Sequence, residues 1–128
     1  MSYYFSKIVD LNFDDTLVKV ENELKKEGFG VLTEIDVQAT LKKKLDVDFR
    51  RYKILGACNP PFAHKALTAE DKIGVLLPCN VIVQETIDNK VEVAFMNPIE
   101  AMQAVKNEAL GKIAEEINNK LKKVYEQL

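Results

Sequence analysis

The sequence predicts one α+β domain over residues 1–128, with about five strands and four helices in the order β-α-β-α-β-α-β-β-α. Stretches rich in β-branched and aromatic residues alternate with stretches whose apolar residues recur every three or four positions. The last two strands follow each other as a hairpin, so the sheet is expected to be mainly antiparallel or mixed rather than wholly parallel. No linker, repeat or low-complexity tract divides the chain.

The chain is expected to open with a strand and a helix. Residues Tyr3–Val9 are rich in β-formers and predict the strand. Asn12 or Asp14 then provides an N-cap for the helix, and Gly28 follows its end. The apolar residues of this helix are spaced four, three and four positions apart: Phe13, Leu17, Val20 and Leu24.

A second strand and a short helix come next. The strand is predicted over Phe29–Ile35, and Asp36 is placed to cap the helix. The helix would have apolar residues on one face and lysines elsewhere: Val37, Leu41 and Leu45 against Lys42, Lys43 and Lys44.

The third strand and third helix meet at a proline-rich junction. The strand is predicted over Tyr52–Ala57, and the sequence Asn59-Pro60-Pro61 starts a helix that runs to about Ala69. The Asn59 side chain is expected to accept a hydrogen bond from an unpaired amide of this helix, and proline at the first helical position has the required φ and no amide hydrogen left unpaired.

Two further strands and a long helix complete the prediction. Residues Ile73–Ile87 are apolar but broken at Pro78, and Val91–Met96 follows a two-residue turn at Asp88-Asn89. Asn97-Pro98 begins the final helix, in which Gly111 permits a bend. The apolar stripe of this helix is Ile99, Met102, Val105, Ile113, Ile117, Leu121 and Val124.

Composition excludes several classes of protein. Eighteen Lys and Arg residues against twenty Asp and Glu residues leave a net charge of −2, which makes nucleic-acid binding an unfavoured function. No apolar run approaches the roughly 20 residues of a membrane span, and the first residues lack a secretory signal. Two cysteines cannot build a disulfide framework, so free thiols in the cytoplasm are expected.

Cys58 is the first candidate for chemistry. It directly precedes the predicted helix start at Asn59, where unpaired amide groups and the helix dipole stabilise a thiolate and lower the pKa of a thiol. Such a thiol is reactive or binds soft metals. The alternative is a small apolar side chain packed at the end of a strand.

Cys79 is the second candidate, because it follows the strand-breaking Pro78 and precedes Asn80. If their strands are neighbours, Cys58 and Cys79 lie close together, but a spacing of twenty-one residues does not establish this. His64, the single histidine, falls on the expected exposed face of its helix and is the weaker metal candidate. Two thiols and one imidazole leave a structural zinc site one ligand short.

Other patterns have simpler explanations. The basic stretch from Lys42 to Lys53 resembles an anion-binding patch but is more typical of a solvated face. Glu34 and Asp36 suit acid–base work, yet Asp36 is more simply a helix cap. No phosphate-binding loop, dinucleotide fingerprint or other organic-cofactor motif is present, and the few serines argue against a serine triad.

Three ordered segments resemble the bacterial and archaeal family known as domain of unknown function 302. They read GFGVLTEID from Gly28, YKILGACNP from Tyr52 and GVLLPCNV from Gly74. The resemblance covers essentially the whole chain and implies a compact α+β domain that assembles as a homodimer. It implies no reaction. The characteristic positions carried over by the resemblance are Cys58, Asn59, Pro60, Pro78 and Cys79.

Three functions are consistent with these residues. The first is a homodimer that binds a soft metal or small polar molecule around Cys58, Asn59 and Cys79. The second is a structural or regulatory interaction module with packed cysteines, and the third is an enzyme that uses Cys58 as a nucleophile or redox thiol. The candidate ligand-binding residues are Cys58, Asn59, Pro60, Pro78, Cys79 and Asn80.

Overall fold

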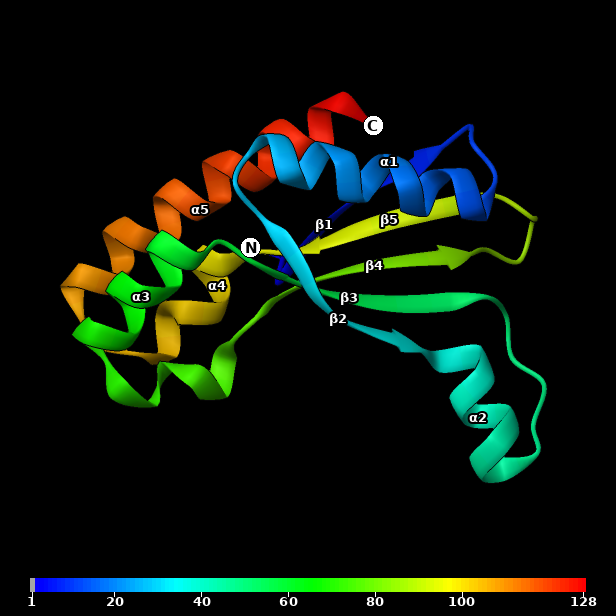
Figure 1. Ribbon diagram of the computed structural model, residues 1–128, viewed down its shortest axis with the longest axis horizontal. Helices are drawn as coiled ribbons and strands as arrows, with labels where there is room; N and C mark the ends of the chain where they lie inside the picture. The colour runs from blue at the N-terminus through cyan, green and yellow to red at the C-terminus, as the bar shows by residue number, and fades with distance from the viewer. Residues whose placement is uncertain (1) are drawn as a thin grey trace.

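A five-stranded antiparallel sheet forms the centre of this computed structural model, which describes residues 2–128 (Figure 1). The spatial order is β1-β5-β4-β3-β2, and every neighbouring pair is antiparallel. The predicted α+β class is confirmed, with a sheet that is antiparallel throughout. The strands are β1 (Tyr4–Val9), β2 (Gly30–Asp36), β3 (Tyr52–Cys58), β4 (Cys79–Glu85) and β5 (Val91–Met96).

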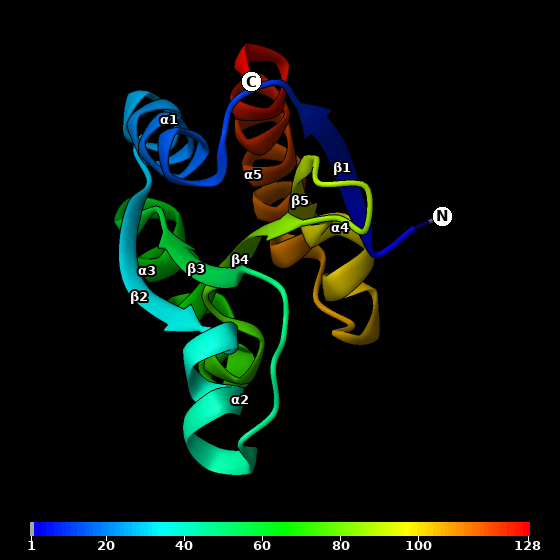
Figure 2. The same cartoon turned by 90° about the vertical axis from the view of Figure 1, so that its right-hand side faces the viewer.

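The helices occupy three places around the sheet (Figures 1 and 2). Helices α1 (Phe13–Lys26) and α5 (Glu108–Gln127) cover one face. Beyond one end of the sheet lie α3 (Pro60–Ala69) and α4 (Pro98–Ala101), with the short 3-10 helices η1 (Asp71–Leu76) and η2 (Met102–Ala104). Helix α2 (Val37–Leu45) projects from the β2 edge and has no buried residue.

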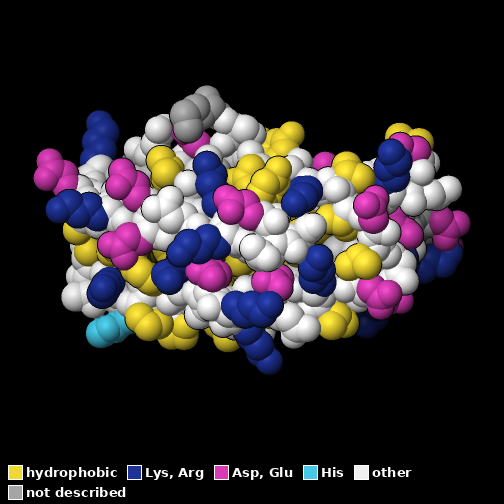
Figure 3. All heavy atoms as spheres, turned by 90° about the horizontal axis from the view of Figure 1, so that it is seen from above, with side chains coloured by type: hydrophobic (Ala, Val, Ile, Leu, Met, Phe, Trp, Pro, Cys, Tyr) yellow, Lys and Arg dark blue, Asp and Glu magenta, His cyan; other side chains and the backbone are white. Residues whose placement is uncertain are grey.

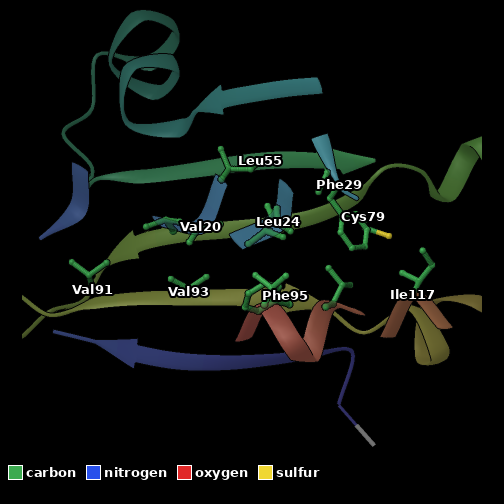
Figure 4. Packing of buried hydrophobic residues seen from close by; sticks show 14 of the residues in the cluster. Val20, Leu24, Phe29, Leu55, Cys79, Val91, Val93, Phe95 and Ile117 are labelled. Carbon is green, nitrogen blue, oxygen red and sulfur yellow. The ribbon is translucent and has the colours of Figure 1, made fainter. Parts of the chain in front are cut away.

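The main core lies between the sheet and helices α1 and α5. Phe95, Leu55 and Val81 of the strands are fully buried, as are Leu24 of α1 and Leu121 of α5. Figure 4 shows Cys79 and Ile117 at one end of this cluster and Val91 at the other. The outer side of the helical layer is charged, with basic and acidic side chains interspersed (Figure 3).

The predicted caps of the first two helices are confirmed. Asn12 Oδ1 accepts a hydrogen bond from the Asp15 amide at 2.8 Å, and Asp36 Oδ1 accepts one from Ala39 at 2.9 Å. Each carboxamide or carboxylate oxygen thereby pairs an amide that the helix itself leaves free. Gly28, just after α1, has φ +85°, a left-handed conformation that favours glycine.

Two predicted elements differ from the structure. Residues Asp71–Leu76 form the 3-10 helix η1 rather than a strand, and β4 begins only after Pro78. The predicted final helix is broken at residues 105–107, and α5 is continuous through Gly111. The break is stabilised by Asn107, whose Oδ1 caps α5 and whose Nδ2 donates to the Ala69 carbonyl at 2.9 Å.

The β4–β5 hairpin has one more loop residue than predicted. Thr86 and Lys90 are joined by a backbone hydrogen bond of 2.8 Å, so three residues lie between them. Asn89 has φ 60°, the left-handed geometry expected at Asp88-Asn89.

The second face of the sheet is left uncovered by α1 and α5 and carries one apolar row between polar side chains, which include Asn80, Gln84 and Glu92. The register places Ile35, Ile54, Ile82 and Ala94 in one row across four strands. Because alternate residues of a strand point to opposite faces, this row lies opposite the core residues Leu55 and Val81. Ile35 is 49% exposed, and Tyr4 of β1 is also exposed on this side.

Among residues 2–128, no helix combines the length and apolar character needed to cross a bilayer.

Candidate functional site

A cavity of about 300 Å³ lies at the end of the sheet around which α3, α4 and α5 gather. Its walls come from the first half of β2, the end of β3, the start of β4, helix α3, residues Pro98–Met102 and the first half of α5, with residues that flank the strands. The lining side chains are apolar except for two thiols, the Thr33 hydroxyl and the Asn59 carboxamide. The space is suited to a small, mainly apolar molecule.

Several of the predicted site residues meet at this cavity. Cys58, Asn59, Pro78 and Cys79 all line it. Pro60 is exposed at the first position of α3 and is not part of the wall.

Asn80 and His64 lie elsewhere. Asn80 belongs to the uncovered face of the sheet, where it lines a separate hollow with Tyr4 and Tyr52. His64 is exposed on α3, as the helical periodicity predicted.

The two cysteines occupy neighbouring strands. Ala57 of β3 pairs directly with Cys79 of β4, so Cys58 is one residue further along the ladder, and both thiols are free. The register thus places the two residues on adjacent strands, and Cys58 is near enough to contribute to the raised pKa of Cys79.

Burial determines the protonation of Cys79. Its side chain is 8% exposed, and loss of solvation raises the pKa of the thiol from 9.0 to about 11, with a smaller contribution from the nearby Cys58. At neutral pH, Cys79 is therefore an uncharged thiol and a poor nucleophile.

The start of α3 provides fewer amide donors beside Cys58 than the sequence argument assumed. Pro60 and Pro61 occupy the first two helical positions and have no amide hydrogen. The Ala63 amide is already bonded to the Asn59 carbonyl at 2.9 Å, which leaves only that of Phe62. Among the hydrogen bonds of residues 2–128, none involves either sulfur.

Asn59 occupies the N-cap position of α3, but its side chain does not cap the helix. Its Nδ2 instead donates to the Glu27 carbonyl, at 3.2 Å, near the C-terminal end of α1. Only 7% of the residue is exposed, and its Oδ1 accepts no hydrogen bond from residues 2–128, although this oxygen is not sealed from solvent as Asn118 Oδ1 is. The expectation that this side chain accepts from α3 amides is wrong, because the proline at the second helical position removes one of the amides it would pair.

A β-bulge shapes the cavity mouth. The β2–β3 register shifts between Val31 and Thr33, which displaces Leu32 from the regular alternation. Leu32 is 68% exposed and lines the cavity, together with the partly exposed Leu67 of α3. Thr33 and Pro78, which also line the cavity, both lie close to Gly56. A Cβ at Gly56 would lie 2.8 Å from Pro78 Cγ.

The structure gives little support to a metal site or to an anion-binding patch in the basic stretch from Lys42 to Lys53. Residues 2–128 contain no group of three or more His, Cys, Asp or Glu side chains placed to hold a metal ion. In the basic stretch, Arg51 pairs with Asp14 at 2.7 Å and Lys53 with Glu34 at 2.6 Å. These ion pairs leave those cations less available to an anionic ligand.

Sequence reasoning missed the wall formed by α4 and α5. Met102, Ile113 and Ile117 belong to the apolar stripe predicted for one final helix, but only Ile113 and Ile117 lie on α5, whereas Met102 lies in η2 before the break. Apolar periodicity indicates that a side chain is turned inward, but it does not distinguish a packed core from a cavity wall.

The chain is similar to proteins of one family in both sequence and structure. A family model described as "Domain of unknown function DUF302" matches residues 5–128. The crystal structure of an uncharacterized conserved protein DUF302 from Bacillus stearothermophilus is similar, with a TM-score of 0.90 and 28% sequence identity over 97% of this chain and 96% of that one. The curated proteins contain no match.

Proposed function

This chain belongs to the DUF302 family, a domain family of unknown function, and we propose that it binds a small, mainly apolar organic molecule in the cavity beside Cys58 and Cys79. The observation that carries the proposal is the wall itself, which is apolar on nearly all sides although it encloses about 300 Å³. Protein interiors are close-packed, and a space of this size forfeits packing contacts that a ligand restores.

An apolar ligand fits the wall better than the metal or polar molecule suggested by the sequence. The wall contains no Asp, Glu, Lys, Arg or His side chain, and the raised pKa of Cys79 keeps that thiol uncharged at neutral pH. Burying a charged ligand there would cost free energy with no counter-charge to offset it. The polarizable thiols are compatible with an apolar or aromatic surface.

The experiment uses indene, a hydrocarbon smaller than the cavity, as the test ligand. Wild-type protein is expected to show a rise in Tm that grows with indene concentration, since a ligand that binds only the folded state stabilises it. Ala63→Phe places a ring in the cavity from α3 and is expected to abolish the rise.

Ala109→Phe is the matched control, because Ala109 is exposed in the first turn of α5 and does not line the cavity. It should retain the full rise in Tm. The proposal is wrong if indene leaves the Tm of the wild type unchanged, or if Ala63→Phe folds and binds indene as the wild type does.

We further propose that the protein is a cytoplasmic homodimer joined through its uncovered sheet face. A second copy suits this face because a twofold pair can bring a residue of one copy against a different residue of the other, and Arg50 and Glu92, which carry opposite charges, both lie beside the apolar row. Free thiols are the usual state of cysteine in the cytoplasm.

A further inference from the structure

We propose that Asn59 is the polar anchor of the cavity and that the ligand is an uncharged ring compound with one N–H or O–H group, of the indole or phenol class. The donor of the ligand would bond to Asn59 Oδ1 while its ring fills the apolar space. This inference rests on the proposed function and adds the chemical class of the ligand.

The carboxamide of Asn59 is held in one orientation. Its Nδ2 is engaged by the Glu27 carbonyl at 3.2 Å and lies 3.1 Å from the position that a Cβ would take at Gly28. With Nδ2 fixed at the end of α1, the carbonyl oxygen is the atom left to bond a ligand. The residue is 7% exposed and lines the cavity.

The carbonyl oxygen of Asn59 is an accessible acceptor in a mainly apolar cavity. Among residues 2–128, the side-chain atom that is sealed from solvent without a partner is Asn118 Oδ1, so Asn59 Oδ1 is open to solvent or to a ligand. A few polar groups placed in an apolar cavity fix the orientation of a ligand. Asn59 Oδ1 accepts no hydrogen bond from residues 2–128, and neither α3 nor α1 supplies a donor to it. A ligand donor would pair this atom.

The remaining polar groups of the wall are weaker candidates for the anchor. Thr33 is exposed at the mouth, where water can satisfy its hydroxyl. The Cys79 thiol is neutral and only a weak donor and acceptor. The wall contains no charged side chain to pair a carboxylate or an ammonium group, so the ligand is uncharged.

The test compares indole with indene, a hydrocarbon of nearly the same shape that lacks the N–H group. Both affinities are measured by calorimetry for wild type and for Asn59→Leu. Loss of the acceptor is expected to shift the indole-to-indene affinity ratio by about tenfold toward indene, because the buried indole N–H is then unpaired. Thr33→Val removes the other oxygen of the wall and should leave the ratio unchanged.

The outcomes separate the two proposals. If indole and indene both bind and Asn59→Leu leaves their ratio unchanged, the anchor is wrong and the cavity function stands. If neither compound binds the wild type, both proposals fail. Should Asn59→Leu not fold, a crystal structure of wild type with indole decides: the indole nitrogen must lie within about 3.2 Å of Asn59 Oδ1, and any other orientation overturns the anchor.

Discussion

At the scale of single residues, burial rather than the helix dipole determines the behaviour of the site. Cys79 lies at the start of β4 among apolar neighbours and is held as a thiol. Cys58 precedes a helix whose first two positions are prolines and therefore lacks most of the amide donors that would stabilise a thiolate. The wall is consequently suited to binding without a charged centre.

The raised pKa of Cys79 makes stability depend on pH at the alkaline end. The unfolded chain releases this proton near pH 9.0 and the folded chain near pH 11, so the folded state binds more protons between these values. The stabilisation is fully present below pH 9 and is lost as the pH rises toward 11, by up to about 2–3 kcal/mol.

Urea titrations at intervals from pH 8 to 11 measure this effect. Cys79→Val lacks the titrating thiol, and its free energy of unfolding should fall less over that range than that of wild type. Equal slopes for the two proteins would show that Cys79 does not carry the predicted shift.

The sequence predicted only some of the residues that line the cavity. The proline-rich helix start and the strand-breaking proline drew attention to Cys58, Asn59, Pro78 and Cys79, and all four line the cavity. The hydrogen bond from Asn59 to Glu27 was not predictable, because it joins residues 32 apart whose proximity depends on the packing of α1 against the end of β3.

At the scale of elements, local rules located most helices and strands. Cap residues and apolar spacing placed α1, α2 and α3 within one or two residues of their observed bounds. The same rules failed for Asp71–Leu76, where an apolar composition suited to a strand forms a 3-10 helix ending at Leu77-Pro78. They also failed at Asn107, whose side chain bonds to Ala69 of α3, a tertiary contact that local spacing does not contain.

Gly111 provides a test of how α5 is stabilised. It lies within the helix, and a Cβ built there would have no neighbour within 4 Å. Gly111→Ala is therefore expected to raise the free energy of unfolding by about 0.5–1 kcal/mol, since glycine loses more backbone entropy in a helix than alanine does.

Thermal or urea unfolding of Gly111→Ala measures this gain, and Ala109→Gly, two residues away in the same helix, should lose a similar amount. A destabilised Gly111→Ala protein would mean that the residue serves a backbone geometry other than a regular helix.

At the scale of the whole molecule, the two faces of the sheet differ in what covers them. Helices α1 and α5 bury one face, whereas the row containing Ile54, Ile82 and Ala94 faces outward without a helix above it. An apolar sheet face of this extent is typical of an interaction surface. The apolar character of both faces of β4 was visible in the sequence, but which face would be covered was not.

Sedimentation velocity at micromolar concentration tests the proposed dimer. Wild type is expected to sediment as a dimer, and Ile82→Lys as a monomer, because the substitution places a charge at the centre of the uncovered face. Ile87→Lys is the matched control, since Ile87 is fully exposed in the β4–β5 loop and should leave the dimer intact. A wild-type monomer would refute the dimer.

The residues at the cavity mouth are different from the residues that form the buried core. Leu32, Ala63 and Leu67 line the cavity but belong to neither buried core cluster. Mutations at these positions would therefore accumulate without unfolding the sheet. Related proteins with the same backbone could therefore differ at these positions and bind molecules of different shape.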